Sequence, residues 1–251
     1  MIAITFALPT ESADLRRQLR DVREESDLIL GKIDPPSPRL LRAGNHQRVG
    51  TREELRSHDI AIVHTGVGAK NCNERVEALL HKARPRLVVS SGFAGAVAER
   101  LEVGDLIVAE NFSEPQLLAS AGKILHHRKP RVVKLFTSTS IVDSIAERNE
   151  IARKSGAAAV DMETGAIVGV CSAHGVPLLS LRAISDTPSE PLPAPPDVLF
   201  DLERQRTNYG WLFSYILREP ASALRLLRFG QTIAGVRAAL TDALVALIRE
   251  L

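Results

Sequence analysis

Three acidic residues, Glu11, Glu163 and Asp186, stand where carboxylates could take part in catalysis. Asp186 comes two residues after the mostly apolar run 176–184, a pattern typical of a strand covered on both faces. Ligands of open α/β sheets collect outside the carboxyl ends of the strands, so a carboxylate there is well placed for chemistry. A structural explanation is also open for each residue. Glu11 and Glu163 suit the first turn of a helix, and Asp186 suits a turn.

The segments around these carboxyls must position them. Glu11 lies in a loop, residues 9–12, between the apolar run 1–8 and a segment, 13–22, that looks helical. Glu163 enters the first turn of a helix whose apolar residues recur at helical spacing between 160 and 171. Gly175 and Pro177 end that helix. We therefore expect Glu11 and Asp186 at the carboxyl ends of two strands.

Glycines follow two further apolar runs. Gly66 and Gly68 come after the run 59–65, and residues 92–96 (GFAGA) form a turn after the run 86–91. Glycine lets the backbone approach a ligand closely, which suits a binding site. The third glycine of the dinucleotide-binding fingerprint is missing, so a Rossmann interpretation fails.

Two motifs, VDME at 160–163 and RAISD at 182–186, resemble the nucleoside phosphorylase/nucleosidase superfamily. The resemblance is greatest to its methylthioadenosine/S-adenosylhomocysteine nucleosidases, and the two motifs occur at family-like separation. It implies that Met162 and Glu163 hold the ribose. It also implies that Asp186, next to Ser185, hydrogen-bonds or protonates N7 of the leaving purine, and that Glu11 orients or deprotonates the attacking water.

The resemblance further implies a pocket built largely from main chain. Gly66 and Gly68 match a family segment near the reaction centre, and Ile141 and Val142 fall near the base. The nucleosidases often present an aromatic face to the base, so these two aliphatic residues leave the identity of the base open. The rest of the pocket matches a glycine-rich turn that lines the base and ribose, with phenylalanine in place of a small polar residue: Ser91, Gly92, Phe93, Ala94 and Gly95.

These roles imply cleavage of the N-ribosidic bond of a purine nucleoside, and we expect hydrolytic release of adenine from a 5′-modified adenosine. An acid on the leaving purine and a base on the water divide the work as paired carboxylates do in glycoside hydrolysis. As the acid, Asp186 would need a pKa raised by burial or by a neighbouring carboxylate. The reaction needs no cofactor and no metal.

Two alternatives remain open. One is phosphorolysis on the same fold, including a hopanoid-associated enzyme acting on adenosylhopane. The loop 9–12 contains no arginine that could bind phosphate. The other is a non-catalytic nucleoside-binding protein, which would not require Glu11.

The expected fold class is α/β. We expect a single-domain, phosphorylase/hydrolase-like three-layer sandwich with a central mixed and twisted sheet, and a C-terminal helical extension. The catalytic domain spans residues 1–196 and the extension 197–251, with a polar loop or edge region at 113–134. Strands are expected near residues 2–8, 59–65, 86–91, 104–110 and 176–184.

The extension contains an aromatic segment at 207–217 and, from Leu226 to Leu251, apolar residues that recur at threes and fours. This spacing is typical of an amphipathic helix. Such a helix packs on its own domain or on a second subunit, and we expect a homodimer because family members commonly dimerise. A peripheral membrane or lipid contact through these helices is the alternative.

Composition narrows the remaining classes. The chain has 251 residues, 45% hydrophobic and 25% charged, which is ordinary for a soluble globular protein. Its net charge of +2 is too small to imply nucleic-acid binding. The two cysteines and seven histidines show no metal-binding spacing, so we expect no metal. No signal peptide or long apolar run is found, so we expect a cytoplasmic protein.

Overall fold

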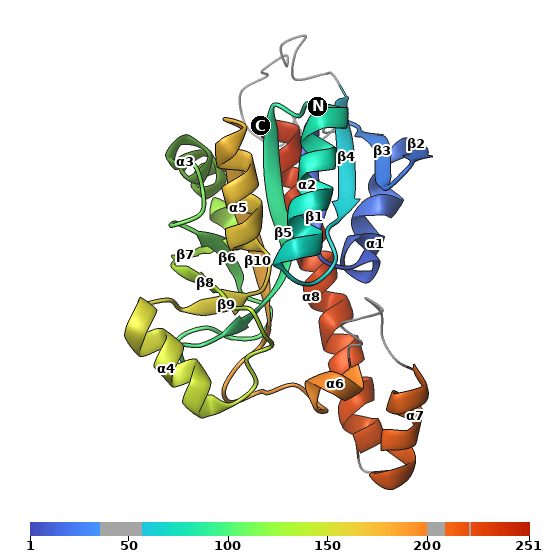
Figure 1. The fold of residues 1–251 in the computed structure, drawn as a ribbon, viewed down its shortest axis with the longest axis vertical. Helices are drawn as coiled ribbons and strands as arrows, with labels where there is room; N and C mark the ends of the chain where they lie inside the picture. Colours follow the sequence, from blue (N-terminus) through green and yellow to red (C-terminus); the bar gives the residue numbers. More distant parts are fainter. Residues whose placement is uncertain (36–56, 200–208, 221) are drawn as a thin grey trace, which may run out of the picture.

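The computed structural model describes residues 1–35, 57–199, 209–220 and 222–251, and shows one mixed sheet between two layers of helices (Figure 1). The strands are β1 (Ile2–Phe6), β2 (Arg20–Glu25), β3 (Leu28–Ile33), β4 (His58–His64), β5 (Leu87–Ala96), β6 (Leu106–Ala109), β7 (Arg131–Val133), β8 (Leu135–Thr137), β9 (Ala159–Asp161) and β10 (Leu178–Asp186). The helices are α1 (Pro9–Gln18), α2 (Ala69–Ala83), α3 (Pro115–Ile124), the short 3-10 helix η2 (His126–Arg128), α4 (Ile145–Ser155), α5 (Thr164–Ala173), α6 (Pro196–Leu199), α7 (Tyr209–Arg218) and α8 (Ser222–Glu250). The predicted α/β sandwich with a mixed sheet is confirmed.

The sheet has the strand order β2-β3-β4-β1-β5-β10-β6-β7, and β9 pairs with the end of β5 and with β8. The four central strands, β4, β1, β5 and β10, are parallel, so their carboxyl ends meet at one edge. Glu11 follows β1, Gly66 and Gly68 follow β4, and Asp186 ends β10. This edge therefore collects most of the predicted site residues, as expected for an open α/β sheet.

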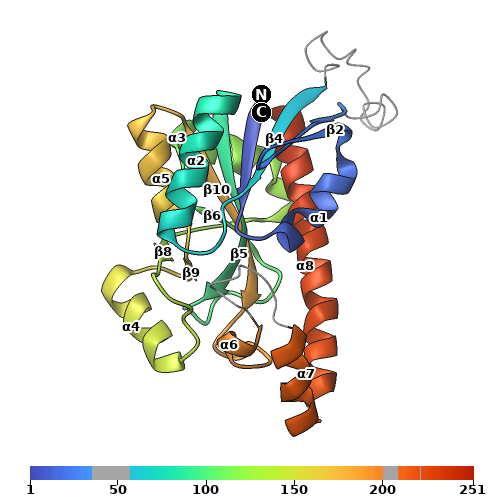
Figure 2. The ribbon, with the colours of Figure 1, turned by 45° about the vertical axis from the view of Figure 1, so that its right-hand side comes forward.

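Alternate residues of the central strands pack into two cores, one on each face of the sheet. Ile2 and Ile4 of β1 pack with Leu15 of α1 and with the second half of α8. Ala3, which points the other way, packs with α2 and α5. Figure 2 shows α8 along one side of the sheet and α2 and α5 on the other. The helices thus cover both faces and leave the carboxyl edge for a site.

Several element boundaries differ from those expected. Helix α1 begins at Pro9, a residue that suits the first helical position, so Glu11 lies in a helix and not in a loop. Strand β5 continues through residues 92–96, which pair with β10 and β9, so the expected turn is a strand. Strand β10 likewise runs to Asp186, and Val160 belongs to β9. The region 113–134 contains α3 and the edge strand β7.

The C-terminal segment ends in α8, a helix about 44 Å long. Val236, Leu240 and Leu244 in its second half are buried in the core of the sandwich. The first half projects from the body beside α7 (Figure 1), and there Leu224 and Leu227 are exposed. The expected amphipathic helix is therefore present, and half of it packs on its own domain.

Helix α8 is also the one helix in the described part of the chain that is long and apolar enough to cross a membrane, with a mean hydropathy of 1.4. Its second half is buried in the sandwich, as is typical of a core helix, which can pass the same test of length and hydropathy. The boundary at residue 196 stays a prediction. Residues 200–208 and the side chains of 209–213, which hold most of the aromatic segment, lie outside the described part.

Candidate active site

Two of the three predicted carboxyls lie against one segment of β5, residues 92–95, and the third interacts with one of these two. Glu11 contacts the start of this segment, Asp186 lies against its end, and Glu163 interacts electrostatically with Glu11. All three residues are 6–8% exposed. The fold therefore brings them to one place from three distant parts of the sequence.

Glu11 is the third residue of α1, and its carboxylate turns back toward the residues before the helix. It accepts hydrogen bonds from the backbone N–H of Leu8, at 3.0 Å, and of Phe93, at 3.2 Å. Burial raises the pKa of Glu11, and these hydrogen bonds and the charge of Arg182 oppose the rise. A carboxyl with a raised pKa, held at a fixed position, suits a general base.

Glu11 lies this close to β5 because residue 92 is glycine. Gly92 has a φ of 140°, which residues with a side chain rarely adopt. A Cβ at this position would lie 2.7 Å from Nη1 of Arg182 and 3.0 Å from Oε1 of Glu11. The missing side chain therefore makes room for two charged groups of the site itself.

Arg182 of β10 is a buried guanidinium that joins three elements at this edge. Its Nη2 lies 2.9 Å from Oδ2 of Asp161 and donates to the hydroxyl of Thr164 at 2.8 Å. Its Nη1 donates to the carbonyl of Ser91 at 2.8 Å. Because Asp161 ends β9 and Thr164 begins α5, Arg182 fixes the short segment that carries Glu163. The sequence signal for this role is a charged residue inside an otherwise apolar strand.

Glu163 directly precedes α5. Burial raises its pKa to about 8, the charges of Asp161 and Glu11 act in the same direction, and Arg182 lowers it. The carboxyl is therefore largely protonated at neutral pH. A neutral carboxyl can donate a hydrogen bond to a sugar hydroxyl, and positive charge on a sugar beside it would favour its ionised form.

Asp186 forms a buried ion pair with Arg148 of α4, and the two side chains are 8% and 1% exposed. Nη2 of Arg148 donates to Oδ2 of Asp186, and Nη1 donates to the carbonyl of Ala96 at 2.7 Å. The hydroxyl of Ser185 donates to Oδ1 of Asp186 at 2.6 Å. Both carboxylate oxygens are thus held by donors, and the charged partner is an arginine, not a second carboxylate. No sequence pattern predicts Arg148 as a site residue.

Other predicted residues line the same edge. Gly66 and Gly68 have positive φ values of 73° and 97°, and the N–H of Gly66 donates to the carbonyl of Ala7. Met162 is half-buried. The hydroxyl of Ser91 is buried and has no hydrogen-bond partner among the described residues, so its contact with a bound molecule stays a prediction.

The residues predicted near the base and the ribose have additional structural roles. Val142 packs in a buried apolar cluster with Val97 and Val160, whereas Ile141 is half-buried. Phe93 packs against the core on the α8 side of the sheet, and its backbone N–H donates to Glu11. The carbonyl of Ala94 accepts a long hydrogen bond, 3.4 Å, from Ser185. Contact of these residues with a base stays a prediction.

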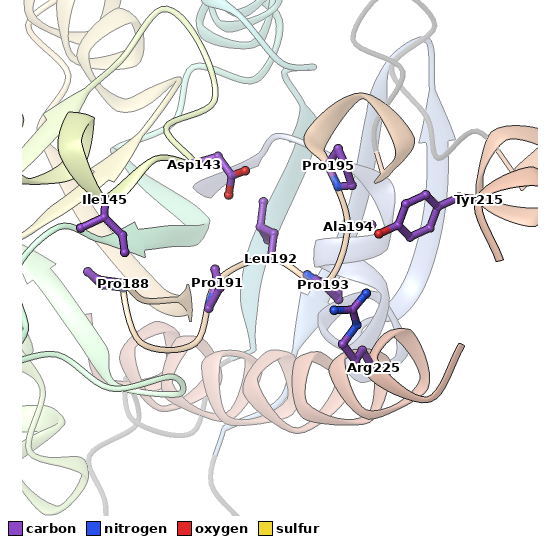
Figure 3. Close-up of a pocket in the computed structure, with 10 residues that line it drawn as sticks. All are labelled: Asp143, Ile145, Pro188, Pro191, Leu192, Pro193, Ala194, Pro195, Tyr215 and Arg225. Carbon is purple, nitrogen blue, oxygen red and sulfur yellow. The ribbon is translucent and has the colours of Figure 1, made fainter. Parts of the chain in front are cut away.

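A pocket of about 400 Å³ adjoins this edge (Figure 3). Pro188 and Leu192, in the segment that follows Asp186, line one side of it. Tyr215 of α7 and Arg225 of α8 line the other side, and these two helices form a hairpin. None of the three carboxyls lines it, so it neighbours the carboxyl cluster without containing it. The hairpin of α7 and α8 therefore faces the segment that follows Asp186.

The sequence matches known proteins. The sequence model of the phosphorylase superfamily matches residues 1–114 and 112–210. The 5′-methylthioadenosine/S-adenosylhomocysteine nucleosidase of Staphylococcus haemolyticus is 25% identical over 214 residues, which cover 74% of this chain and 86% of that enzyme.

Solved structures share the fold. An S-adenosylhomocysteine nucleosidase from Streptococcus pyogenes, in complex with 5-methylthiotubericidin, superposes with a TM-score of 0.68 at 20% identity, covering 100% of this chain and 96% of that one. The futalosine hydrolase of Helicobacter pylori has a TM-score of 0.68 at 15% identity, covering 100% and 97%. At these identities the likeness shows the fold alone.

Proposed function

Because the chain belongs to the phosphorylase superfamily, we propose that it cleaves the N-ribosidic bond of a purine nucleoside and releases adenine from a 5′-modified adenosine by hydrolysis. The observation that carries this proposal is that Glu11 and Asp186 lie at residues 92–95 of β5 and that Glu163 interacts with Glu11, each carboxyl in a different environment. The names of the matched relatives, methylthioadenosine/S-adenosylhomocysteine nucleosidases, support the substrate class.

Glu11 activates the attacking water in this proposal. Two backbone N–H groups fix its carboxylate, and burial raises its pKa. As the bond from water oxygen to C1′ forms, Glu11 takes the proton that the water releases.

Glu163, together with Met162, binds the ribose hydroxyls. Breaking the C1′–N9 bond leaves positive charge on the sugar, and a nearby carboxylate stabilises that charge. With a pKa of about 8, Glu163 can shift toward its ionised form as the charge develops.

Asp186 serves the leaving purine. The electron pair of the broken bond goes to the purine, which departs as neutral adenine when N7 carries a proton from solvent. Ser185 and Arg148 fix both oxygens of Asp186, so the carboxylate is a preset acceptor for the N7–H group. Arg148 is a positioning residue in this scheme, because it acts through Asp186.

Water is favoured over phosphate as the acceptor. The two buried arginines described here are engaged, Arg182 with Asp161 and Arg148 with Asp186, so a phosphate would have to compete for them. An ionised Glu11 would also repel a phosphate, since unit charges 4 Å apart interact by about 4 kcal/mol at an effective dielectric of about 20. Phosphorolysis, including of adenosylhopane, is the alternative.

Release of the purine base from methylthioadenosine, S-adenosylhomocysteine, futalosine and adenosylhopane tests the proposal in phosphate-free buffer. Asp186→Asn and Glu11→Gln should each lower kcat by about 10²- to 10⁴-fold while substrate still binds, because the first removes the charged acceptor for N7–H and the second removes the base for water. Glu190→Gln, a change at an exposed residue four positions after Asp186, is the control and should leave kcat unchanged. A wild-type protein that binds these nucleosides without turnover would show a binding protein instead.

We further propose that the helical hairpin contacts an anionic lipid surface. Leu217, Leu224 and Leu227 are 52–65% exposed, and exposed arginines, Arg218 and Arg228, directly follow two of them. Exposed leucines beside arginines suit the interface of an anionic bilayer.

Co-flotation with anionic phospholipid vesicles tests this contact. The doubly substituted variant Leu224→Glu/Leu227→Glu should lose flotation, while Val22→Glu, at an exposed apolar residue of β2, should keep it. The lipid contact would be contradicted if the doubly substituted variant and Val22→Glu floated equally well, or if the wild-type protein did not float.

We infer that the protein acts as a homodimer, as the family resemblance implies. Sedimentation velocity at micromolar concentration should give a dimer, and a monomer would contradict the inference.

A further inference from the structure

A second cluster of chemically active side chains lies where the end of α2 meets the end of α5. Glu77 and His81 are four residues apart on α2 and so share one face of the helix, and His174 directly follows α5. Nε2 of His174 lies 2.7 Å from Oε2 of Glu77, and Nε2 of His81 lies 3.7 Å from the same oxygen. The two imidazole rings meet edge to face with centroids 5.4 Å apart.

The spacing of these atoms fits a metal ion. One ligand atom from each residue lies within 4.8 Å of the other two. A tetrahedral zinc ion with bonds of about 2.0–2.1 Å places its ligand atoms about 3.4 Å apart, which falls between the two measured separations. Small rotations of exposed side chains would therefore complete the geometry.

The types of ligand atom indicate which metal ion this cluster would bind. Two imidazoles and one carboxylate suit zinc or a similar first-row divalent ion, whereas magnesium and calcium take oxygen ligands. Three protein ligands leave a fourth position for water, in keeping with the partly exposed side chains. Both helices also end here, and the partial negative charge of helix C-termini favours a cation.

We propose that Glu77, His81 and His174 form a binding site for Zn²⁺ that cross-links α2 to α5. These helices begin after Gly68 and Glu163, so the ion would stabilise the helical layer behind the candidate active site. Sequence spacing predicts no metal here because His174 is 97 residues from Glu77, and only the fold brings them together.

Titration of the untagged, chelator-treated full chain with Zn²⁺ against a chromophoric chelator tests the site, alongside thermal unfolding. The wild type should bind one ion per chain and gain Tm with Zn²⁺ but not with Mg²⁺. His81→Ala and His174→Ala should each weaken Zn²⁺ binding by at least about tenfold and remove the Zn²⁺-dependent rise in Tm. His127→Ala, at an exposed histidine of η2, should behave as the wild type.

Absence of stoichiometric Zn²⁺ binding would overturn the proposal, and so would binding that survives both substitutions. His81 is the cleaner test, because its side chain is 73% exposed and its loss should not disturb folding. The Tm of His174→Ala without added metal reports the loss of its hydrogen bond with Glu77 alone. A difference from the wild type that appears only with Zn²⁺ therefore identifies the metal.

Discussion

Replacing Arg148 by methionine should destabilise the folded protein by about 3–5 kcal/mol, because it leaves the carboxylate of Asp186 buried without its cation. The side chains of the pair are 1% and 8% exposed, so water replaces little of the lost interaction. Methionine keeps most of the apolar stem of arginine, which limits the loss of packing. The second loss is the hydrogen bond from Arg148 to the carbonyl of Ala96.

Urea unfolding at pH 7, with linear extrapolation to water, measures this change. The control is Arg153→Met on the same helix, whose partner Glu150 forms an exposed pair, 69% and 44% exposed. That change should cost at most about 1 kcal/mol. Adding Asp186→Asn to Arg148→Met should recover part of the loss, because the unpaired charge is removed. Equal losses for Arg148→Met and Arg153→Met would refute the role assigned to the buried pair.

Two further predictions follow from the geometry around β5. Gly95→Ala places a Cβ 3.0 Å from Oδ2 of Asp186 and should lower kcat about tenfold by displacing the carboxylate. Gly169→Ala in α5, where a Cβ meets nothing within 4 Å, should leave kcat unchanged and add up to about 1 kcal/mol of stability. Burial raises the pKa of Glu163 to about 8, whereas the pKa in the unfolded chain is about 4.5. Between these values the folded state keeps a proton that the unfolded state has lost. The free energy of unfolding should therefore fall as pH rises from about 5 to 8. Glu163→Gln, which stays neutral, should flatten this fall in urea-unfolding experiments, and an unchanged slope would contradict the assignment.

The buried strands could be predicted from the sequence, because each depends on a local run of apolar residues. The apolar runs before Glu11 and at 176–184 correspond to β1 and β10, because buried parallel strands are continuous apolar segments. Strand ends were less predictable. Residues 92–96 contain two glycines and a turn-like composition, yet they form a strand because β10 and β9 pair with them.

The site was predictable only where a motif marks it. Glu163 and Asp186 stand in motifs, and the fold brings Glu163 close to Glu11 and Asp186 against Gly95 of β5. Arg148 lies on a helix with ordinary charge patterning, and its burial against Asp186 depends on how α4 docks on the end of β5. The Glu77–His174 contact likewise arises from the packing of two helices that are distant in sequence.

The central claim, hydrolysis at C1′ with Glu11 as the base, is tested most directly by the fate of the acceptor oxygen. The reaction is run with methylthioadenosine in heavy-oxygen water, with and without phosphate, and the sugar product is analysed by mass spectrometry. We expect the label on the ribose hydroxyl at C1, a rate that does not depend on phosphate, and almost no labelled product with Glu11→Gln. Formation of a ribose 1-phosphate derivative only when phosphate is present would contradict hydrolysis and establish phosphorolysis.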